Sequence, residues 1–248
     1  MPARTGKEQM QSPPDQDRLF AALEATWPPV EAVEAGGFRV RKGAGGGKRV
    51  SAASQIDPAA DIEQAVAAMA AWGQTPLFQL TGQGDLDRDL ERQGYLVADP
   101  TLLYVASSDA LCGDQPIPAA HARGFIPVLM EEIWAEGGIG TARLAVMERA
   151  TGPSVRLLGR ADDRPAGVAF VAVDGDIAMI HAIEVRPAQR RKGVARQLMT
   201  AAARFAQTHG AVWLALAVTQ ANAPARALYE GLGMVQAAQY HYRIKEEA

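Results

Sequence analysis

The chain has one cysteine, Cys112, among its 248 residues. A single thiol excludes an intramolecular disulfide framework and any metal site built from several cysteines. The four histidines do not follow one another at the spacings that metal ligands adopt in zinc sites. The sequence therefore gives no reason to expect a metal-dependent function.

Long apolar runs and an excess of basic charge are also missing. No apolar stretch approaches the roughly 20 residues that a membrane-spanning helix needs, and the polar N-terminus, which leads into Pro13 and Pro14, lacks the apolar core of a signal peptide. The net charge of −3 argues against a general binder of nucleic acids or membrane surfaces. We therefore expect a cytoplasmic protein with no nucleic-acid or membrane partner.

The most informative feature that is present is a basic turn between a strand and a helix, at residues 185–195. Arg190, Arg191 and Lys192 stand directly before Gly193 and the predicted start of the helix. Unpaired backbone N–H groups and the helix dipole make a helix N-terminus an anion site, and glycine lets the backbone approach the ligand closely. In an acidic protein, this local basic turn indicates one discrete anionic ligand.

A second segment follows about thirty residues later, after the strand-like run 211–218. Asn222 is a natural helix cap, and Ala225, Leu228 and Tyr229 follow at helical spacing before Gly233. Either segment alone is compatible with an ordinary capped helix. Their order and spacing together, Arg190-x-x-Gly193-x-Ala195 and then Asn222-x-x-Ala225-x-x-Leu228-Tyr229, resemble the signature of the GNAT acyl-CoA N-acyltransferases.

Hydrophobic periodicity predicts a β-β-β-α-β-α-β order over the C-terminal part, 115–248, after two short helices. This is the order of a GNAT core, so the resemblance implies an α/β (α+β) fold with a twisted mixed sheet flanked by helices. The expected elements are helices 127–136 and 141–149, strands 155–160, 167–173 and 177–185, helix 194–208, strand 211–218, helix 222–232 and strand 239–245.

The N-terminal part, 16–110, resembles a degenerate half-copy of the same fold. It contains no Arg-x-x-Gly-x-Gly/Ala turn and is not expected to bind CoA in the usual way. Residues 1–15 are predicted to be a flexible leader, and the turn-rich segment 107–117 is the predicted boundary. The expected elements are helix 18–26, a hairpin of strands 37–41 and 48–52 across the glycine turn 43–47, helix 61–72, strand 77–80, helix 86–93 and strand 95–105.

The segment Gly43–Lys48 invites comparison with a nucleotide-binding P-loop. That motif requires a glycine five positions before its final Gly-Lys pair and a Ser or Thr directly after the lysine. Here Lys42 occupies the first position and Arg49 the second. A hairpin turn or a loop is the expected structure, and a nucleotide-dependent enzyme built on this loop is the alternative of a different class.

The resemblance implies acetyl-CoA as the cosubstrate and no metal. It places the pyrophosphate against the basic turn, and it gives the counterpart of Asn222 a hydrogen bond to the pantetheine arm besides its capping role. The residues expected to contact the cosubstrate are Ile183, Val185, Arg190, Arg191, Lys192, Gly193, Val194, Ala195, Asn222 and Tyr229.

Acyl transfer to an amine needs a proton acceptor, a polarised carbonyl and a protonated leaving thiolate. Tyr229 is the candidate for protonating the sulfur, against the alternative of a buried packing residue. Some relatives carry a glutamate as base where this chain has Ala217. Glu184 and His181 are the remaining candidates, against a salt-bridged strand residue, a hydrogen-bonded core histidine, or a base supplied through water.

The resulting hypothesis is an enzyme that transfers an acetyl group from acetyl-CoA to a primary amine by direct attack in a ternary complex. No cysteine lies near the basic turn, which disfavours a covalent acyl-enzyme. A non-catalytic CoA-binding or interaction protein is the alternative. The acceptor is expected to be a small-molecule or peptide amine, and the sequence leaves open its identity, the acyl chain length and the oligomeric state, a homodimer included.

Overall fold

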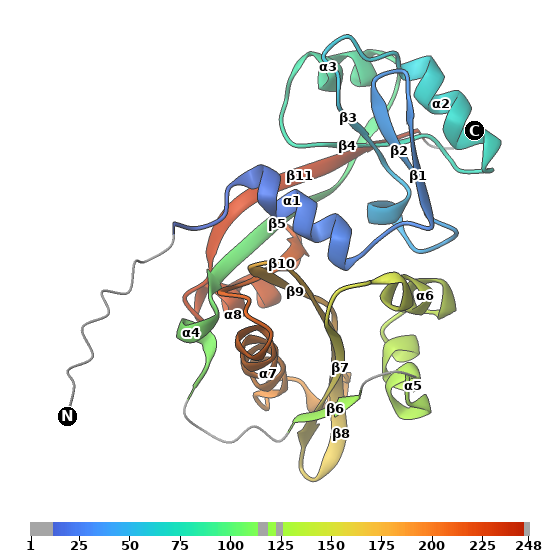
Figure 1. Cartoon of the computed structure of the whole chain (residues 1–248). Coiled ribbons are helices and arrows are strands. Elements are labelled where there is room, and N and C mark those ends of the chain that lie inside the picture. Colours follow the sequence, from blue (N-terminus) through green and yellow to red (C-terminus); the bar gives the residue numbers. More distant parts are fainter. Residues whose placement is uncertain (1–11, 114–118, 123–125, 246–248) are drawn as a thin grey trace.

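The computed structural model describes residues 12–113, 119–122 and 126–245. Its strands form one eleven-stranded sheet that runs through the whole molecule (Figure 1). The strands are β1 Glu31–Ala35, β2 Phe38–Lys42, β3 Ala53–Gln55, β4 Leu77–Leu80, β5 Leu96–Ser107, β6 Ala119–Ala122, β7 Ser154–Ala161, β8 Arg164–Asp174, β9 Ile177–Val185, β10 Trp213–Thr219 and β11 Val235–Ile244.

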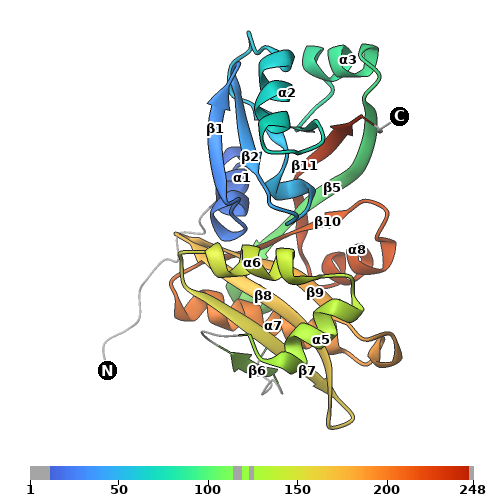
Figure 2. The ribbon, with the colours of Figure 1, turned by 90° about the vertical axis from the view of Figure 1, so that its right-hand side faces the viewer.

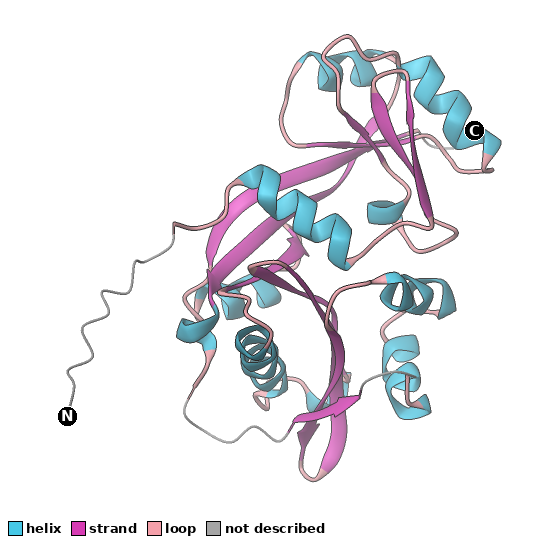
Figure 3. Cartoon of the chain, viewed as in Figure 1, coloured by secondary structure: helices cyan, strands magenta, loops and turns pink. Residues whose placement is uncertain are grey.

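Helices flank this sheet on both faces (Figure 3). They are α1 Gln16–Thr26, α2 Ile62–Ala71, α3 Asp85–Arg92, α4 Ser108–Leu111, α5 Val128–Glu136, α6 Thr141–Arg149, α7 Val194–Thr208 and α8 Ala223–Glu230, with the short 3-10 helices η1 Lys48–Val50 and η2 Pro187–Gln189. Most of the predicted leader, 1–11, and residues 114–117 of the predicted boundary lie outside the described residues.

The strand order is the same when the sheet is read inward from β1 at one end and from β7, next to the additional edge strand β6, at the other. It runs β1-β2-β3-β4-β11-β5-β10-β9-β8-β7-β6. The pairs β3–β4 and β9–β10 are both parallel, and α2 and α7 make the two crossovers. β11 lies between β4 and β5, while β5 lies between β11 and β10. The last strand of each half is therefore inserted into the sheet of the other half.

The C-terminal half of the sheet packs helices against both of its faces. On one face, the long amphipathic helix α7 buries Val194, Leu198 and Phe205 against β7, β8 and β9. On the other face lie α5 and α6, with Ile133 and Met147 in their core, and α1 beside them with Leu19. Figure 2 shows α5 and α6 in front of these strands and α7 behind them.

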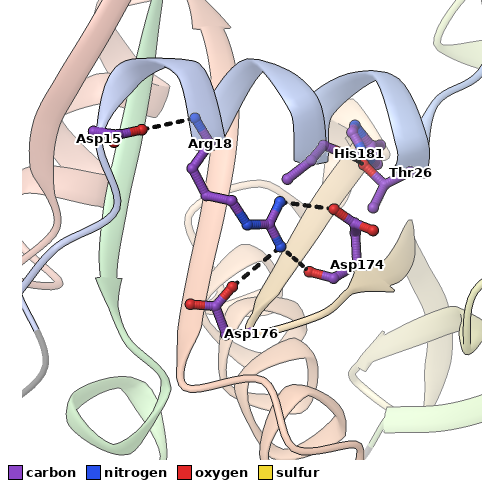
Figure 4. A network of polar contacts seen from close by, with 7 residues as sticks. Asp15, Arg18, Thr26, Asp174, Asp176 and His181 are labelled. Atoms are coloured by element: carbon purple, nitrogen blue, oxygen red, sulfur yellow. Dashed lines mark hydrogen bonds and ion pairs between the residues drawn. The ribbon is translucent and has the colours of Figure 1, made fainter.

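Helix α1 connects the two halves through its polar contacts as well as its apolar face (Figure 4). The Arg18 guanidinium pairs with the Asp174 carboxylate at 2.7 Å and with that of Asp176 at 3.1 Å, and it also donates to the Asp174 carbonyl. The Asp15 carboxylate accepts the Arg18 backbone N–H and so caps α1. The helix is thereby fixed over the turn between β8 and β9.

The elements of the N-terminal half differ from the prediction at its first hairpin. β2 pairs with β1 across a turn at Gly36 and Gly37. The sequence did not predict the strand β1. The predicted partner strand 48–52 is wrong, because Lys48–Val50 forms η1 and the pairing with β2 begins only at Ala53. The glycine loop therefore connects β2 to a short helix before the chain enters β3.

Candidate active site

A bulge in β9 decides which side chains face the candidate site. Val168 pairs with Glu184 and Phe170 with His181, so two residues of β9 stand opposite one of β8. Ala182 takes a positive φ of 50° at this point. Because the extra residue shifts the alternation of side chains by one, His181 and Glu184 reach the same face of the sheet.

The bulge is held by a side chain from α5. The indole N–H of Trp134 donates a hydrogen bond of 2.8 Å to the carbonyl oxygen of Ala182. Trp134 is fully buried. Its hydrogen bond also fixes the backbone of the strand directly before Ile183 and Glu184, and nothing in the sequence pointed to this role.

The parallel strands β9 and β10 separate on the way to this site. They pair only where Trp213–Ala215 lies beside Ile177–Met179, near their first residues. Beyond Met179 and Ala215 no further pairing joins the two strands. The ends of β9 and β10, which carry Glu184 and Thr219, therefore border an opening in the sheet.

The turn between β9 and α7 has the geometry that the sequence predicted for an anion site. Arg191 and Gly193 take positive φ values of 63° and 80°, and no side chain caps the N-terminus of α7. A Cβ added at Gly193 would have no heavy atom within 4 Å, so the conformation and the open approach, not packing, favour glycine there. Val194, the first helical residue, is buried and anchors the turn.

The basic side chains of this turn are exposed, as is Ala188 before them. Lys192 makes an ion pair of 2.6 Å with Asp162, and the Arg190 Nε–H donates to the Val185 carbonyl at 3.2 Å. Ala195 is half-buried in the first turn of α7. The turn thus combines exposed positive charge with a helix N-terminus that no side chain caps.

Glu184 is half-buried beside the C-terminal end of α5. A Cβ at Gly137 would lie only 2.6 Å from the Glu184 Oε2 atom and 2.7 Å from Cγ, so the glycine leaves the space that this side chain fills. Burial raises the pKa of the Glu184 carboxyl above its ordinary value, and the positive charges of Arg190 and Arg143 oppose the rise. The sequence identified Glu184 but gave no signal for Arg143.

Tyr229 lies on α8 and is almost fully buried. Burial, and in second place the negative charge of Glu184, raise the pKa of the Tyr229 phenol to about 12. Its ring lies 6.1 Å from that of Tyr104, centroid to centroid. Asn222 caps α8 by accepting the Ala225 N–H at 3.2 Å, as the sequence predicted. The charge of Glu184 on β9 therefore acts on Tyr229 on α8.

His181 occupies a different environment. It is 4% exposed, and its ring lies against Trp27 at 5.1 Å. Its Nε2 is 2.9 Å from the Thr26 hydroxyl and its Nδ1 is 3.3 Å from an Arg49 nitrogen, so both ring nitrogens have partners. Burial, with the nearby positive charge of Arg49, holds the pKa of His181 well below its usual range. These contacts favour the core-histidine alternative over a role as base.

The glycine loop 43–47 packs against α6. A Cβ at Gly46 would lie 2.6 Å from Val146, and one at Gly45 would lie 3.3 Å from Ala142. Gly47 faces the Arg143 guanidinium. Close packing against a helix leaves the loop without the open cradle that phosphates require, which supports the interpretation as an ordinary loop over the nucleotide-binding one.

The described part of the chain contains neither a metal-binding cluster nor a membrane-spanning helix. No group of three or more His, Cys, Asp or Glu residues there is arranged to hold a metal ion. None of the helices in that part is long and apolar enough to cross a membrane.

Comparisons with known proteins agree with the geometry. Residues 127–234 match the profile of the Acetyltransferase (GNAT) family. A streptothricin acetyltransferase of Streptomyces lavendulae is 44% identical over 80 residues, which is 26% of this chain and 42% of that protein. A [ribosomal protein bS18]-alanine N-acetyltransferase of Salmonella typhimurium is 42% identical over 77 residues, or 31% of this chain and 52% of that protein.

The chain thus spans about half, or less, of the length of these curated relatives. Among solved structures, a GCN5-related N-acetyltransferase from Kribbella flavida superposes with a TM-score of 0.68 over 93% of this chain and 95% of its own, at 18% identity. That similarity establishes the fold over both halves. With the basic turn, the separated parallel strands and the family match in agreement, residues 127–234 form a domain of the Acetyltransferase (GNAT) family, and the chain as a whole has the GNAT fold.

Proposed function

We propose that this protein transfers an acetyl group from acetyl-CoA to the primary amine of a small molecule or peptide. The observation that supports this most directly is the uncapped N-terminus of α7, with Gly193 at a φ of 80°, beside the opening between β9 and β10. The two curated relatives are named for acetyl transfer, and one of them for acetylation of an alanine.

The cosubstrate would lie along this opening, and the chain's own residues fit it. Free N–H groups of α7 and the side chains of Arg190, Arg191 and Lys192 would bind the pyrophosphate. Backbone groups of Ile183 and Val185, on the strand next to the bulge, would hold the acyl carbonyl and polarise its oxygen. Val194, Ala195 and Asn222 would complete the contacts at the starts of α7 and α8.

In this proposal Glu184 is the base. The amine nitrogen attacks the acetyl carbonyl carbon while its proton passes to the Glu184 carboxylate. Because the pKa of Glu184 is raised from its ordinary value, the carboxylate is a stronger proton acceptor than a free glutamate. The carbon–sulfur bond then breaks, and the sulfur takes the proton of the Tyr229 hydroxyl, which a pKa of about 12 keeps protonated at neutral pH. Attack is direct, in a ternary complex.

We further propose that the N-terminal half is a degenerate copy of the C-terminal half. Both halves contain a parallel strand pair with a helical crossover, followed by a second helix and a strand inserted into the opposite sheet. At the position equivalent to the basic turn, the N-terminal half carries the Asp61 cap of α2 and Glu63 in its first turn. An acidic helix start disfavours a pyrophosphate, which supports a single CoA site in the C-terminal half.

Calorimetric titration with acetyl-CoA tests the site, with the double variant Arg190→Ala/Gly193→Glu as its control. Micromolar binding by the wild type that the variant loses supports the site, while equal binding by both contradicts it. A thiol-release assay over a panel of small amines and peptide N-termini then distinguishes an enzyme from a non-catalytic CoA-binding protein. Binding without any amine-dependent thiol release would favour the latter, which is the alternative function.

A further inference from the structure

Arg49 presents a positive charge at the junction of the two halves without a counter-charge. It belongs to η1, directly after the glycine loop. Its Nε atom is buried and has no hydrogen-bond partner, and one Nη atom contacts His181 Nδ1 at 3.3 Å. Within the described ranges, no carboxylate forms an ion pair with it.

The neighbours of Arg49 do not supply a negative charge either. The phenols of Tyr240 and Tyr242 hydrogen-bond with the guanidinium and raise the pKa of Arg49, but they are not carboxylates. Burial raises the pKa of Tyr242 well above its ordinary value, so that hydroxyl is neutral at physiological pH. An arginine stays protonated in proteins, and a buried charge without a partner destabilises the fold. An anion bound at this point would remove that cost.

A cavity of about 300 Å³ is available for such an anion. It lies between α1 and the strands β3 and β4, and Arg49 is part of its wall. Its other lining residues offer neutral hydrogen-bonding groups and two aromatic rings: Ser54, Gln79, Thr81, Phe20 and Trp27. The volume corresponds to the small end of ligand pockets, which suits a molecule with few atoms besides its charged group.

The other charged groups of the cavity restrict the charge of the ligand. Arg41 also lines it, but its guanidinium is already bound by Glu24 through two hydrogen bonds of 2.9 and 2.6 Å. Glu24 and Asp17 add negative charge to the wall. Because the wall contains one guanidinium without a carboxylate partner and also two carboxylates, a single negative charge fits the cavity better than the double charge of a phosphate.

From this arrangement we infer that the cavity between α1 and the β3–β4 strands binds a small monocarboxylate. Its carboxylate pairs with Arg49, whose planar guanidinium matches it, and its apolar part packs against Trp27 and Phe20. The site is separate from Glu184 and the α7 turn, and its occupancy does not depend on acetyl transfer. The ligand therefore stabilises the junction of the two halves.

Thermal unfolding of the whole chain, without acetyl-CoA, tests the inference. The probes are acetate, butyrate, benzoate and L-valine, each titrated against chloride and inorganic phosphate at matched ionic strength. We expect at least one monocarboxylate to raise Tm in a saturable way and to change the tryptophan fluorescence, to which Trp27 contributes, and phosphate to do neither. If no monocarboxylate has a saturable effect on the wild type, the inference is wrong.

The variant Arg49→Met separates a binding role from a structural one. Removing an unpaired charge while keeping the side-chain volume is expected to raise Tm without ligand and to abolish the carboxylate-dependent shift. Arg39→Met is the matched control, since Arg39 is another arginine of the N-terminal half, which pairs with Glu24 and lies outside this cavity. This control variant is expected to retain the carboxylate-dependent shift. An undiminished shift in Arg49→Met would overturn the assignment. Arg49→Lys keeps the charge and should bind more weakly.

Discussion

Gly137→Ala provides a sharp test of the role of Glu184. The added Cβ would lie 2.6 Å from Glu184 Oε2 and 2.7 Å from its Cγ, whereas ordinary contacts begin at 3.4 Å. The carboxylate must therefore move by roughly 1 Å, and a displacement of that size at a reacting group costs about 100-fold in rate. We expect kcat/KM for the amine to fall by about 100-fold, with the affinity for acetyl-CoA unchanged.

The backbone does not complicate this test. Gly137 has a φ of −86°, which alanine adopts without strain. Gly140, three residues on, has a φ of −88° and no atom within 4 Å of its added Cβ, so Gly140→Ala is the matched control and should retain full activity. Steady-state kinetics and calorimetry of both variants measure the two quantities.

A double-mutant cycle completes the argument. If Gly137→Ala acts only by displacing the carboxylate, it should add nothing to the loss caused by Glu184→Ala. Additive losses, or activity of Gly137→Ala equal to that of Gly140→Ala, would refute Glu184 as the base and favour proton removal through water.

Three further predictions follow from the site and from α1. Tyr229→Phe should lower kcat by roughly 100-fold with little change in acetyl-CoA affinity, measured by thiol release. Glu184→Gln should raise Tm at pH 7 more than at pH 4, because a carboxyl whose pKa is raised by folding favours the folded state at low pH and loses this contribution as pH rises through its folded-state pKa. Arg18→Ala should lower the free energy of unfolding in urea by about 1 kcal/mol, since it removes a half-exposed network with Asp174 and Asp176; no change would mean that α1 is held by its apolar face alone.

Much of the C-terminal half was predictable because its signals are local. The apolar period of 194–208 marks α7, and the Asp-Gly pair at 174–175 marks the β8–β9 turn, so these elements follow from short stretches of sequence. The basic turn was predictable for the same reason, since Gly193 stands next to the positive charges and at the helix start.

The features that could not be predicted from the sequence depend on contacts between distant residues, or on residues whose type gives no signal of their conformation. Ala182 takes a positive φ, which an alanine side chain gives no reason to expect. The bulge at this position changes which residues of β9 share a face of the sheet with Glu184. The space at Gly137 exists only because α5 ends beside β9. The pairing of β11 with β4 joins residues more than 150 positions apart, and no local pattern encodes such a partner.

The exchange of final strands between the two halves affects how the protein folds during its synthesis. β11 follows all ten other strands in the sequence, yet it fills the gap between β4 and β5 in the first half. Until residues 235–244 have left the ribosome, β4 and β5 each present an unpaired edge, although every other strand of that half is already available. Completion of the N-terminal half thus waits for the C-terminal strand, and the nascent chain exposes two aggregation-prone edges until that strand arrives.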